Sequence, residues 1–210
     1  MASVPLQDAD RAAAELEYGI KQCGAVGGVI GASVDGVNLG DANLDNFWAA
    51  ASELNVPLFI HPTAPTPSPR TTKYDLNVSV QYTYDSTVSV GSLVLSGVMD
   101  RFPNLRLLLS HGGGYFPYQI FRFDRLYRNH LDEVPLVPTQ TPSDYLRRFW
   151  YDTILHGGPP LRYLCDLVGT DRVLLGTDYP FTVYDPIPLE IIETAGCAGD
   201  DFTRITETNS

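Results

Sequence analysis

The chain has 210 residues, of which 44% are hydrophobic and 19% are charged, and its formal net charge at pH 7 is −11. This length and composition exclude intrinsic disorder and a disulfide-stapled miniprotein, and they predict a single domain over residues 1–210. The negative charge excludes nucleic acids and anionic membrane surfaces as partners, because both repel an acidic protein.

Five short apolar runs predict buried strands. They are nearly continuous in valine, isoleucine and leucine, as a parallel strand covered on both faces requires, whereas a strand with one wet face alternates. The runs lie at residues 27–32 (GGVIGA), 57–61 (PLFIH), 105–111 (LRLLLSH), 149–155 (FWYDTIL) and 172–178 (RVLLGTD).

Helices are predicted before and between these strands. Residues 8–22 place apolar side chains on one face and are followed by Gly24, a residue type that ends helices. We expect Asp85 or Ser86 to cap a helix that continues to about residue 99. The other predicted helices cover residues 45–54, 117–129, 143–149, 159–168 and 188–195. Alternating strands and helices with short connections predict an α/β fold with a parallel sheet.

One long segment interrupts this alternation. Residues 62–84 begin with a proline cluster (PTAPTPSP), which enters neither a central strand nor a helix interior. The segment follows the carboxyl end of a predicted strand, where active-site loops lie in parallel-sheet enzymes. It is interpreted either as a loop over a site or as a flexible excursion.

Three of the four histidines stand at the ends of predicted strands. They are His61, His111 and His156, and Asp178 closes the last run in the same way. Because side chains at the carboxyl ends of barrel strands converge on one mouth, we expect these four to face one another. Imidazoles and a carboxylate suit a divalent metal ion such as zinc. Each histidine taken singly is also open to interpretation as a hydrogen-bonded structural residue, and His130 is interpreted as a surface residue.

Three glycines follow His111. Without a Cβ they leave backbone amides free to approach a ligand, which makes Gly112 and Gly113 candidate substrate-binding residues. The alternative is a tight turn from strand to helix, with Pro117 as the first helical residue and no ligand. Neither nucleotide-binding glycine fingerprint occurs. For Asp178, the alternative to a metal ligand is a turn residue that caps backbone amides.

The amino terminus and the cysteines bear on location. Residues 1–11 (MASVPLQDADR) lack the basic and apolar regions of a signal peptide, and no apolar run approaches the roughly 20 residues that span a bilayer. The cysteines are odd in number and lack the spacing of zinc ligands, which indicates free thiols in a reducing compartment. We therefore expect a cytoplasmic protein without a membrane segment.

Residues 54–62, 96–125 and 149–181 resemble motifs of a known family in composition, order and spacing. The family is that of the amidohydrolase-related metal-dependent decarboxylases, typified by α-amino-β-carboxymuconate-ε-semialdehyde decarboxylase. The resemblance implies a (β/α)8 barrel of the TIM type, a small-molecule carboxylate as substrate, and a homodimer. It also implies one divalent metal ion, most often zinc, with manganese as the alternative.

The resemblance also implies roles for the residues at the strand ends. His61 corresponds to a metal ligand on the family's fifth strand, and Asp178 to an eighth-strand residue that binds metal and takes part in catalysis. His111 corresponds to the catalytic acid/base on the sixth strand. His156, at the end of the seventh, is a candidate substrate-binding residue. The implied reaction is non-oxidative decarboxylation of an aromatic or muconate-type carboxylate, and metal-dependent hydrolysis of a lactone, amide or ester is the second hypothesis.

The sequence departs from the family pattern in one respect. The family uses a His-x-His pair on its first strand as two further metal ligands, and no such pair occurs in these 210 residues. The resemblance therefore implies a partial barrel that covers roughly strands four to eight, with residues 1–8 at the end of the third. We expect its inner face and two edges to be unpaired, which favours self-association or a partner. A catalytically silent chain is the third hypothesis.

Overall fold

The computed structural model describes residues 1–41, 43–63, 68–129 and 138–209. Its centre is a parallel sheet of six strands. In spatial order these are β1 (Ala2–Ser3), β2 (Gly28–Ile30), β5 (Pro57–Ile60), β6 (Arg106–Leu109), β7 (Phe149–Asp152) and β8 (Val173–Leu174). The spatial order follows the chain order without reversal, which is typical of a barrel wall, whereas a doubly wound sheet reverses at a switch point. The predicted partial barrel is thus confirmed.

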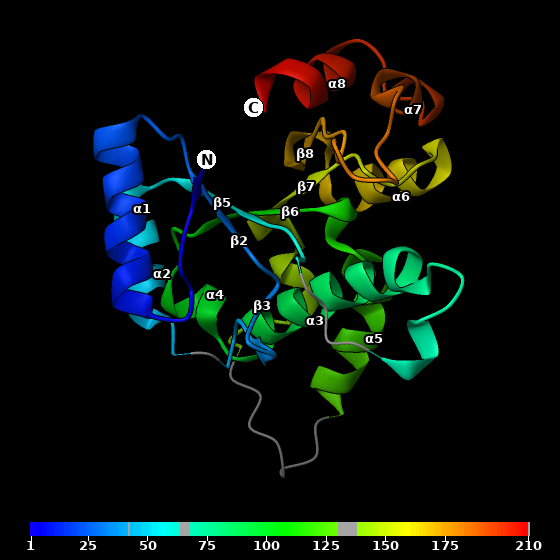
Figure 1. Ribbon diagram of the computed structural model, residues 1–210. Helices are drawn as coiled ribbons and strands as arrows, with labels where there is room; N and C mark the ends of the chain where they lie inside the picture. Colours follow the sequence, from blue (N-terminus) through cyan, green and yellow to red (C-terminus); the bar gives the residue numbers. More distant parts are fainter. Residues whose placement is uncertain (42, 64–67, 130–137, 210) are drawn as a thin grey trace.

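The helices run between the strands and cover the sheet. They are α1 (Ala9–Cys23), α2 (Asp45–Leu54), α3 (Tyr82–Leu95), α4 (Val98–Arg101), α5 (Phe116–Arg128), α6 (Gly158–Val168), α7 (Pro188–Thr194) and α8 (Asp200–Thr203). Figure 1 shows α1 and α2 beside the β1 end of the sheet and α6, α7 and α8 beside the β8 end. Within the described residues, none of the helices has the length and apolar character needed to cross a membrane.

Two short elements depart from the predicted strand set. The edge strand β1 is the one strand of the main sheet outside the five apolar runs. It has two residues, in which Ala2 pairs with Gly28 and Ser3 with Val29. The β1 strand lies within residues 1–8, which the resemblance places at the end of the third strand.

A small antiparallel hairpin, β3 (Ser33–Val34) and β4 (Val37–Asn38), stands outside the main sheet. The hairpin strands have two residues each and carry no hydrophobic period, which is why the sequence did not predict them.

The helix predicted to start at Asp85 or Ser86 begins earlier, so that prediction was wrong. A wide turn over Asn77–Gln81 leads directly into α3, and the amide of Tyr82 donates to the carbonyl of Asn77. Because the preceding turn satisfies the first amides, α3 needs no side-chain cap. The same turn makes the second half of the 62–84 segment helical, while residues 64–67 lie outside the described residues.

The helix predicted to run to residue 99 is also divided, because Gly97 adopts a φ of 75° that a right-handed helix cannot continue. Two further segments differ from the predictions. Pro142–Arg148 forms a tight 3-10 turn in place of a short α-helix, and the carboxyl-terminal Arg204–Thr208 turn and α8 were not predicted.

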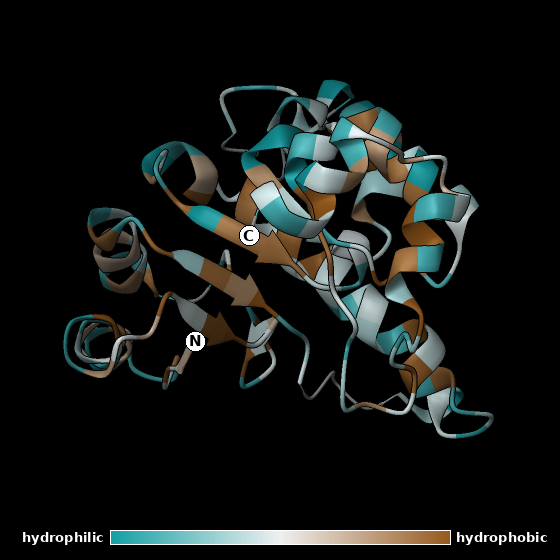
Figure 2. Ribbon diagram, turned by 90° about the horizontal axis from the view of Figure 1, so that it is seen from above, coloured by the Kyte–Doolittle hydropathy of each residue, from teal (hydrophilic) through white to brown (hydrophobic). Residues whose placement is uncertain are grey.

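The core lies between the sheet and its helices. Leu58 and Ile60 of β5 and Leu107 and Leu109 of β6 are fully buried, and they alternate with less buried residues that point to the inner face. The side chains of Leu58 and of Leu16 on α1 both lie next to Gly28, which identifies the buried side as the helix-covered one. Figure 2 shows the strands, mostly brown, lying among helices whose outer turns are largely teal. Only one face of the described sheet is thus fully covered.

One of the two predicted open edges is closed in the structure. The carboxyl-terminal turn lies along β8, where the amide of Leu175 donates to the carbonyl of Ile205 over 3.0 Å. The Asn209 side-chain amide also donates to the carbonyl of Val173 over 2.8 Å. These bonds occupy groups that an edge strand otherwise offers to another chain, so the expectation of an unpaired edge was wrong at β8.

Candidate metal centre and its cavity

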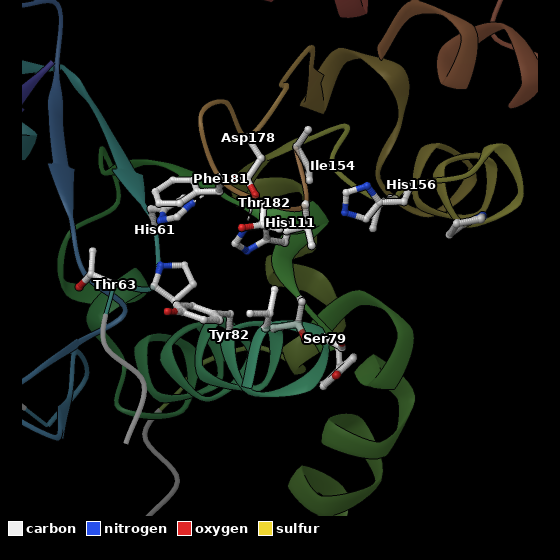
Figure 3. Close-up of a pocket in the computed structure, with 18 of the residues that line it drawn as sticks. His61, Thr63, Ser79, Tyr82, His111, Ile154, His156, Asp178, Phe181 and Thr182 are labelled. Atoms are coloured by element: carbon white, nitrogen blue, oxygen red, sulfur yellow. Dashed lines mark hydrogen bonds and ion pairs between the residues drawn. The ribbon is translucent and has the colours of Figure 1, made fainter. Parts of the chain in front are cut away.

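Three polar side chains meet beyond the carboxyl ends of β5, β6 and β8. His61 directly follows β5, His111 lies two residues beyond β6, and Asp178 lies four residues beyond β8. His61 Nε2 is 3.2 Å from Asp178 Oδ1, and His111 Nε2 is 3.7 Å from Asp178 Oδ2. Figure 3 shows the carboxylate reaching toward both imidazoles. The predicted strands therefore end earlier than their apolar runs, and His111 and Asp178 lie in the turns that follow.

The cluster is shielded from solvent. The side chains of His61, His111 and Asp178 are 15%, 12% and 6% exposed. Burial raises the pKa of Asp178, but its hydrogen bonds with His111 and His61 and their positive charge outweigh burial, so its pKa is lowered. Asp178 is therefore a carboxylate at neutral pH.

The donor set fits a divalent metal ion. One ligand atom from each of the three side chains lies within 4.8 Å of the other two, and the described part of the chain holds no other such group. Two imidazoles and a carboxylate are common ligands of zinc and related ions. Three protein groups also leave coordination positions for water or substrate, as a catalytic site requires.

A left-handed turn holds His111. Its φ is 54°, and the three glycines that follow also have positive φ values. A Cβ at Gly112 would lie 2.6 Å from the Leu155 side chain, and a Cβ at Gly114 would clash with the carbonyl of Thr83. The three glycines are thus needed for conformation and for packing. His111 itself adopts this conformation at a cost of about 1–2 kcal/mol, which the surrounding structure has to offset.

Gly112 and Gly113 are buried, and their amides donate inside the protein. Gly112 donates to Asp152 Oδ1 over 2.9 Å, and Gly113 donates to the carbonyl of Ser110 over 3.0 Å. Of the three glycines, Gly114 is the one that lines the cavity. The tight-turn interpretation therefore accounts for these residues, with Phe116 rather than the predicted proline as the first residue of α5. Substrate contact by Gly112 and Gly113 stays a prediction.

A cavity of about 1000 Å³ opens beside the cluster. His61, His111 and Asp178 border it, and its other walls are mostly apolar and aromatic, formed among others by Tyr82, Tyr115, Tyr118, Ile154, Leu155, Pro160, Phe181 and Val183. Phe181 stacks on His61 with ring centroids 5.4 Å apart and planes inclined by 17°. Flat apolar walls around a few polar groups suit a planar molecule that carries acidic substituents at one end.

His156 lies apart from the cluster. It lines the same cavity from the connection between β7 and α6, and Figure 3 shows it on the far side from His61. The structure thus brings together three of the four residues expected to converge and leaves His156 in the wall. Val78, Ser79 and Tyr82 line the cavity from the 62–84 segment, which supports its interpretation as a loop over a site. His130 lies outside the described residues.

Sequence reasoning missed two residues beside the cluster. Asp152 ends β7 and is buried, and its signal was an acidic residue within the apolar run FWYDTIL. Phe181 stacks on His61, and nothing in the local pattern DYPF marks it as part of a site.

Comparison with known proteins identifies the family of this chain. The family model described as amidohydrolase matches residues 1–210. The 2-amino-3-carboxymuconate-6-semialdehyde decarboxylase of Dictyostelium discoideum is 32% identical over 209 residues, which cover 100% of this chain and 57% of that protein. A gamma-resorcylate decarboxylase of a Polaromonas species is 32% identical over 200 residues, which cover 88% of this chain and 60% of that protein.

Solved structures agree with this result. The 5-carboxyvanillate decarboxylase from Sphingomonas paucimobilis gives a TM-score of 0.89 at 27% identity, covering 99% of this chain and 63% of the other. A dihydroxybenzoic acid decarboxylase from a Polaromonas species, with bound manganese and an inhibitor, gives 0.84 at 25% identity, covering 98% and 65%. The chain therefore spans less than two thirds of the length of these relatives. With its whole length matched, it belongs to the amidohydrolase family.

Proposed function

We propose that the protein is a metal-dependent, non-oxidative decarboxylase of an aromatic or muconate-type carboxylate. The observation that carries this proposal is the cluster of His61, His111 and Asp178 at the border of a cavity with flat aromatic walls. The names of the similar proteins support the substrate class, because they are decarboxylases of a carboxymuconate semialdehyde, a resorcylate and a carboxyvanillate.

Zinc is the proposed ion, and manganese is the alternative. Two imidazoles and a carboxylate favour zinc, whereas the similar Polaromonas structure contains manganese. His61 and Asp178 would hold the ion, with His111 close enough to serve as a third ligand or to face the substrate. When bound, the ion supplies positive charge that orients the substrate and polarises its oxygen atoms.

The chain's own residues supply the proton and the dry environment. Decarboxylation forms a C–H bond at the carbon that carries the carboxylate, and the C–C bond then breaks and releases CO2. His111 is the proposed proton donor to that carbon. Ser110 Oγ lies 3.2 Å from His111 Nδ1 and fixes the orientation of the ring. Phe181 and the tyrosines of the wall hold the ring plane of the substrate and exclude water.

Measurement of CO2 release tests the proposal. Purified protein with added Zn²⁺ or Mn²⁺ is incubated with gamma-resorcylate, 5-carboxyvanillate and the carboxymuconate semialdehyde, and the gas is quantified. We expect release from at least one of them, and loss of release when a chelator removes the ion.

Two other outcomes would replace the proposal. Water consumption with a lactone, amide or ester, and no CO2, would assign a metal-dependent hydrolase. Stoichiometric metal binding without turnover of either kind would assign a silent chain that binds a ligand or a partner.

We further propose that residues 1–210 act as one domain of a cytoplasmic homodimer. A single cluster of buried apolar residues, drawn from both ends of the described chain, supports one domain. The three cysteines are unpaired, in keeping with a reducing compartment. Phe121 and Leu126 of α5 are 66% and 54% exposed, and these exposed apolar side chains support a contact between two chains on that helix. Light scattering on the purified protein measures the mass, and a monomeric mass would overturn the dimer.

A further inference from the structure

A buried aspartate lies next to the turn that carries His111. Asp152, the last residue of β7, is 6% exposed, and it is not one of the described residues that line the cavity. Its Oδ1 accepts hydrogen bonds from the amide of Gly112 over 2.9 Å and from the amide of Ile154 over 3.1 Å. One oxygen atom therefore joins the end of β7 to the turn that carries His111.

The turn depends on this bond. Within it, the amide of Gly113 donates to the carbonyl of Ser110 and the amide of Gly114 donates to the carbonyl of His111, each over 3.0 Å. The amide of Gly112 is satisfied from outside the turn, by Asp152. Because His111 has a φ of 54°, bonds to a neighbouring strand are needed to hold it in that conformation.

A carboxylate in this place is costly. Burial raises the pKa of Asp152 above its ordinary value, and the charge of His111 and the amides of Gly112, Ile154 and His111 offset only part of that rise. An apolar side chain would avoid the cost of burial, but it would leave the buried amide of Gly112 without an acceptor, which is also unfavourable. The need of the Gly112 amide for an acceptor thus explains why an aspartate stands at this buried position.

The next residue of the chain holds the other half of the cluster. Thr153 Oγ1 accepts a hydrogen bond from the amide of Gly176 over 3.1 Å, and Gly176 lies two residues before Asp178. A Cβ at Gly176 would stand 3.1 Å from the Cβ of Asp152, so the two backbones are in close contact. The end of β7 is therefore bonded to the segments on both sides, one carrying His111 and the other carrying Asp178.

We infer that Asp152 is a positioning residue, which holds the His111 turn at the correct distance from Asp178 by accepting the amides of Gly112 and Ile154. The inference rests on the proposed role of His111 as proton donor. Asp152 is not among the described residues that line the cavity, so its role acts through the His111 turn and not through contact with substrate.

Three variants test the inference. Asp152→Ala removes the acceptor, and Asp152→Asn keeps a carbonyl oxygen at the same distance along the side chain. Asp124→Ala is the matched control, because Asp124 on α5 is 3% exposed and accepts the amide of Ser143 over 2.9 Å, away from the cluster. Each variant is measured for kcat and KM of CO2 release and for NMR-detected hydrogen exchange of the Gly112 amide.

We expect Asp152→Ala to lower kcat by about 10–100-fold with KM within about threefold, as for other residues that orient an active imidazole. Its Gly112 amide is expected to exchange at least about tenfold faster. Asp152→Asn is expected to restore both values to within about threefold of the wild type, because it keeps the acceptor. Asp124→Ala is expected to change neither. If Asp152→Ala fails to fold, Asp152→Ser, whose oxygen cannot reach Gly112, replaces it.

Unchanged kcat in Asp152→Ala, or a fall in kcat without faster exchange at Gly112, would overturn the inference. An equal loss of kcat in Asp124→Ala would also overturn it, because the loss would then follow from any missing buried acceptor. Wild-type protein without CO2 release would instead contradict the proposed function, and the exchange rate of Gly112 would still decide whether Asp152 holds the turn.

Discussion

At the carboxyl ends of the central strands polar side chains face a cavity, whereas at the amino ends two arginine side chains lie over an aromatic ring. His61, His111 and Asp178 border about 1000 Å³ of open space. At the opposite ends, Arg106 and Arg172 lie over the ring of Trp150, with guanidinium carbons 5.7 and 4.6 Å from its centre. Polar side chains therefore border open space at one end and pack against an aromatic ring at the other.

The connections that enter the strands from the amino end are also paired within the protein. Asp100 of α4 accepts hydrogen bonds from the hydroxyl of Tyr145 over 2.8 Å and from the amide of Thr139 over 2.9 Å. Arg148 donates to the carbonyl of Pro103 over 2.7 Å. These contacts tie the amino ends of the strands to the connections that enter them, whereas the polar cluster at the carboxyl ends borders a cavity, which is the division expected of a barrel enzyme.

The largest effect of a single change is expected at His111. His111→Asn removes the proton donor and keeps a residue type that tolerates a positive φ, so the turn persists. We expect kcat to fall by about 10²–10⁴-fold while stability and Mn²⁺ binding persist.

His156→Asn is the matched control, because His156 also has a positive φ and lines the cavity away from the cluster. It is expected to raise KM more than it lowers kcat. Steady-state kinetics of CO2 release measure kcat and KM of both variants. A wild-type kcat in His111→Asn would refute the role of His111 as proton donor.

At the amino end the largest effect is expected on stability. Phe149 begins β7, is fully buried and packs edge-on against Phe116. Phe149→Ala is expected to lower the free energy of unfolding by about 3–5 kcal/mol, because it removes a buried ring and leaves a cavity. Urea unfolding measures this value. A loss below about 1 kcal/mol would show that the amino end does not carry the stability assigned to it here.

A smaller effect is expected from the arginines on Trp150. Arg172→Ala is expected to lower the free energy of unfolding by about 1 kcal/mol, because it removes the closer cation from the ring. Arg106→Ala, with the more distant cation, is expected to cost less. Thermal and urea unfolding measure the free energy of unfolding of both variants. A larger loss in Arg106→Ala than in Arg172→Ala would contradict the contacts assigned to the Trp150 ring. Neither variant is expected to change Mn²⁺ binding.

The smallest effect is a pH dependence at Asp100. Burial raises its pKa, but the hydrogen bonds of Thr139 and Tyr145 and the charge of Arg148 outweigh burial and lower it below the ordinary 3.8. A carboxyl group with a lowered folded pKa contributes stability that is present above its unfolded pKa and is lost as the pH falls through its folded pKa. Wild-type protein is therefore expected to lose more stability than Asp100→Asn below about pH 4. Identical acid unfolding profiles would contradict this.

The sequence predicted those parts of the molecule whose signal is local. Apolar runs marked β2, β5, β6, β7 and β8, because a buried strand needs several adjacent apolar residues. The positions of His61, His111 and Asp178 at the ends of these runs predicted that they lie together, because parallel strands bring their carboxyl ends to one side.

The parts that were missed depend on contacts between distant residues. The role of Asp152 follows from the amide of Gly112, 40 residues away in the chain, and the closure of the β8 edge follows from Asn209. The start of α3 depends on a wide turn that propensity does not reveal, so the capping signal at Asp85 was misleading. The placement of His156 in the wall results from its position in the loop before α6.

The central claim is that His61 and Asp178, with His111 beside them, form a site for one divalent metal ion at the carboxyl end of the sheet. Equilibrium dialysis against Mn²⁺ tests it most directly, with wild-type protein, Asp178→Ala and His156→Ala. We predict about one bound ion per chain in the wild type and in His156→Ala, and at least about 100-fold weaker binding in Asp178→Ala, because it removes the anionic ligand between the two imidazoles. Wild-type protein that binds no Mn²⁺, or Asp178→Ala that binds it as tightly as the wild type, would contradict the claim.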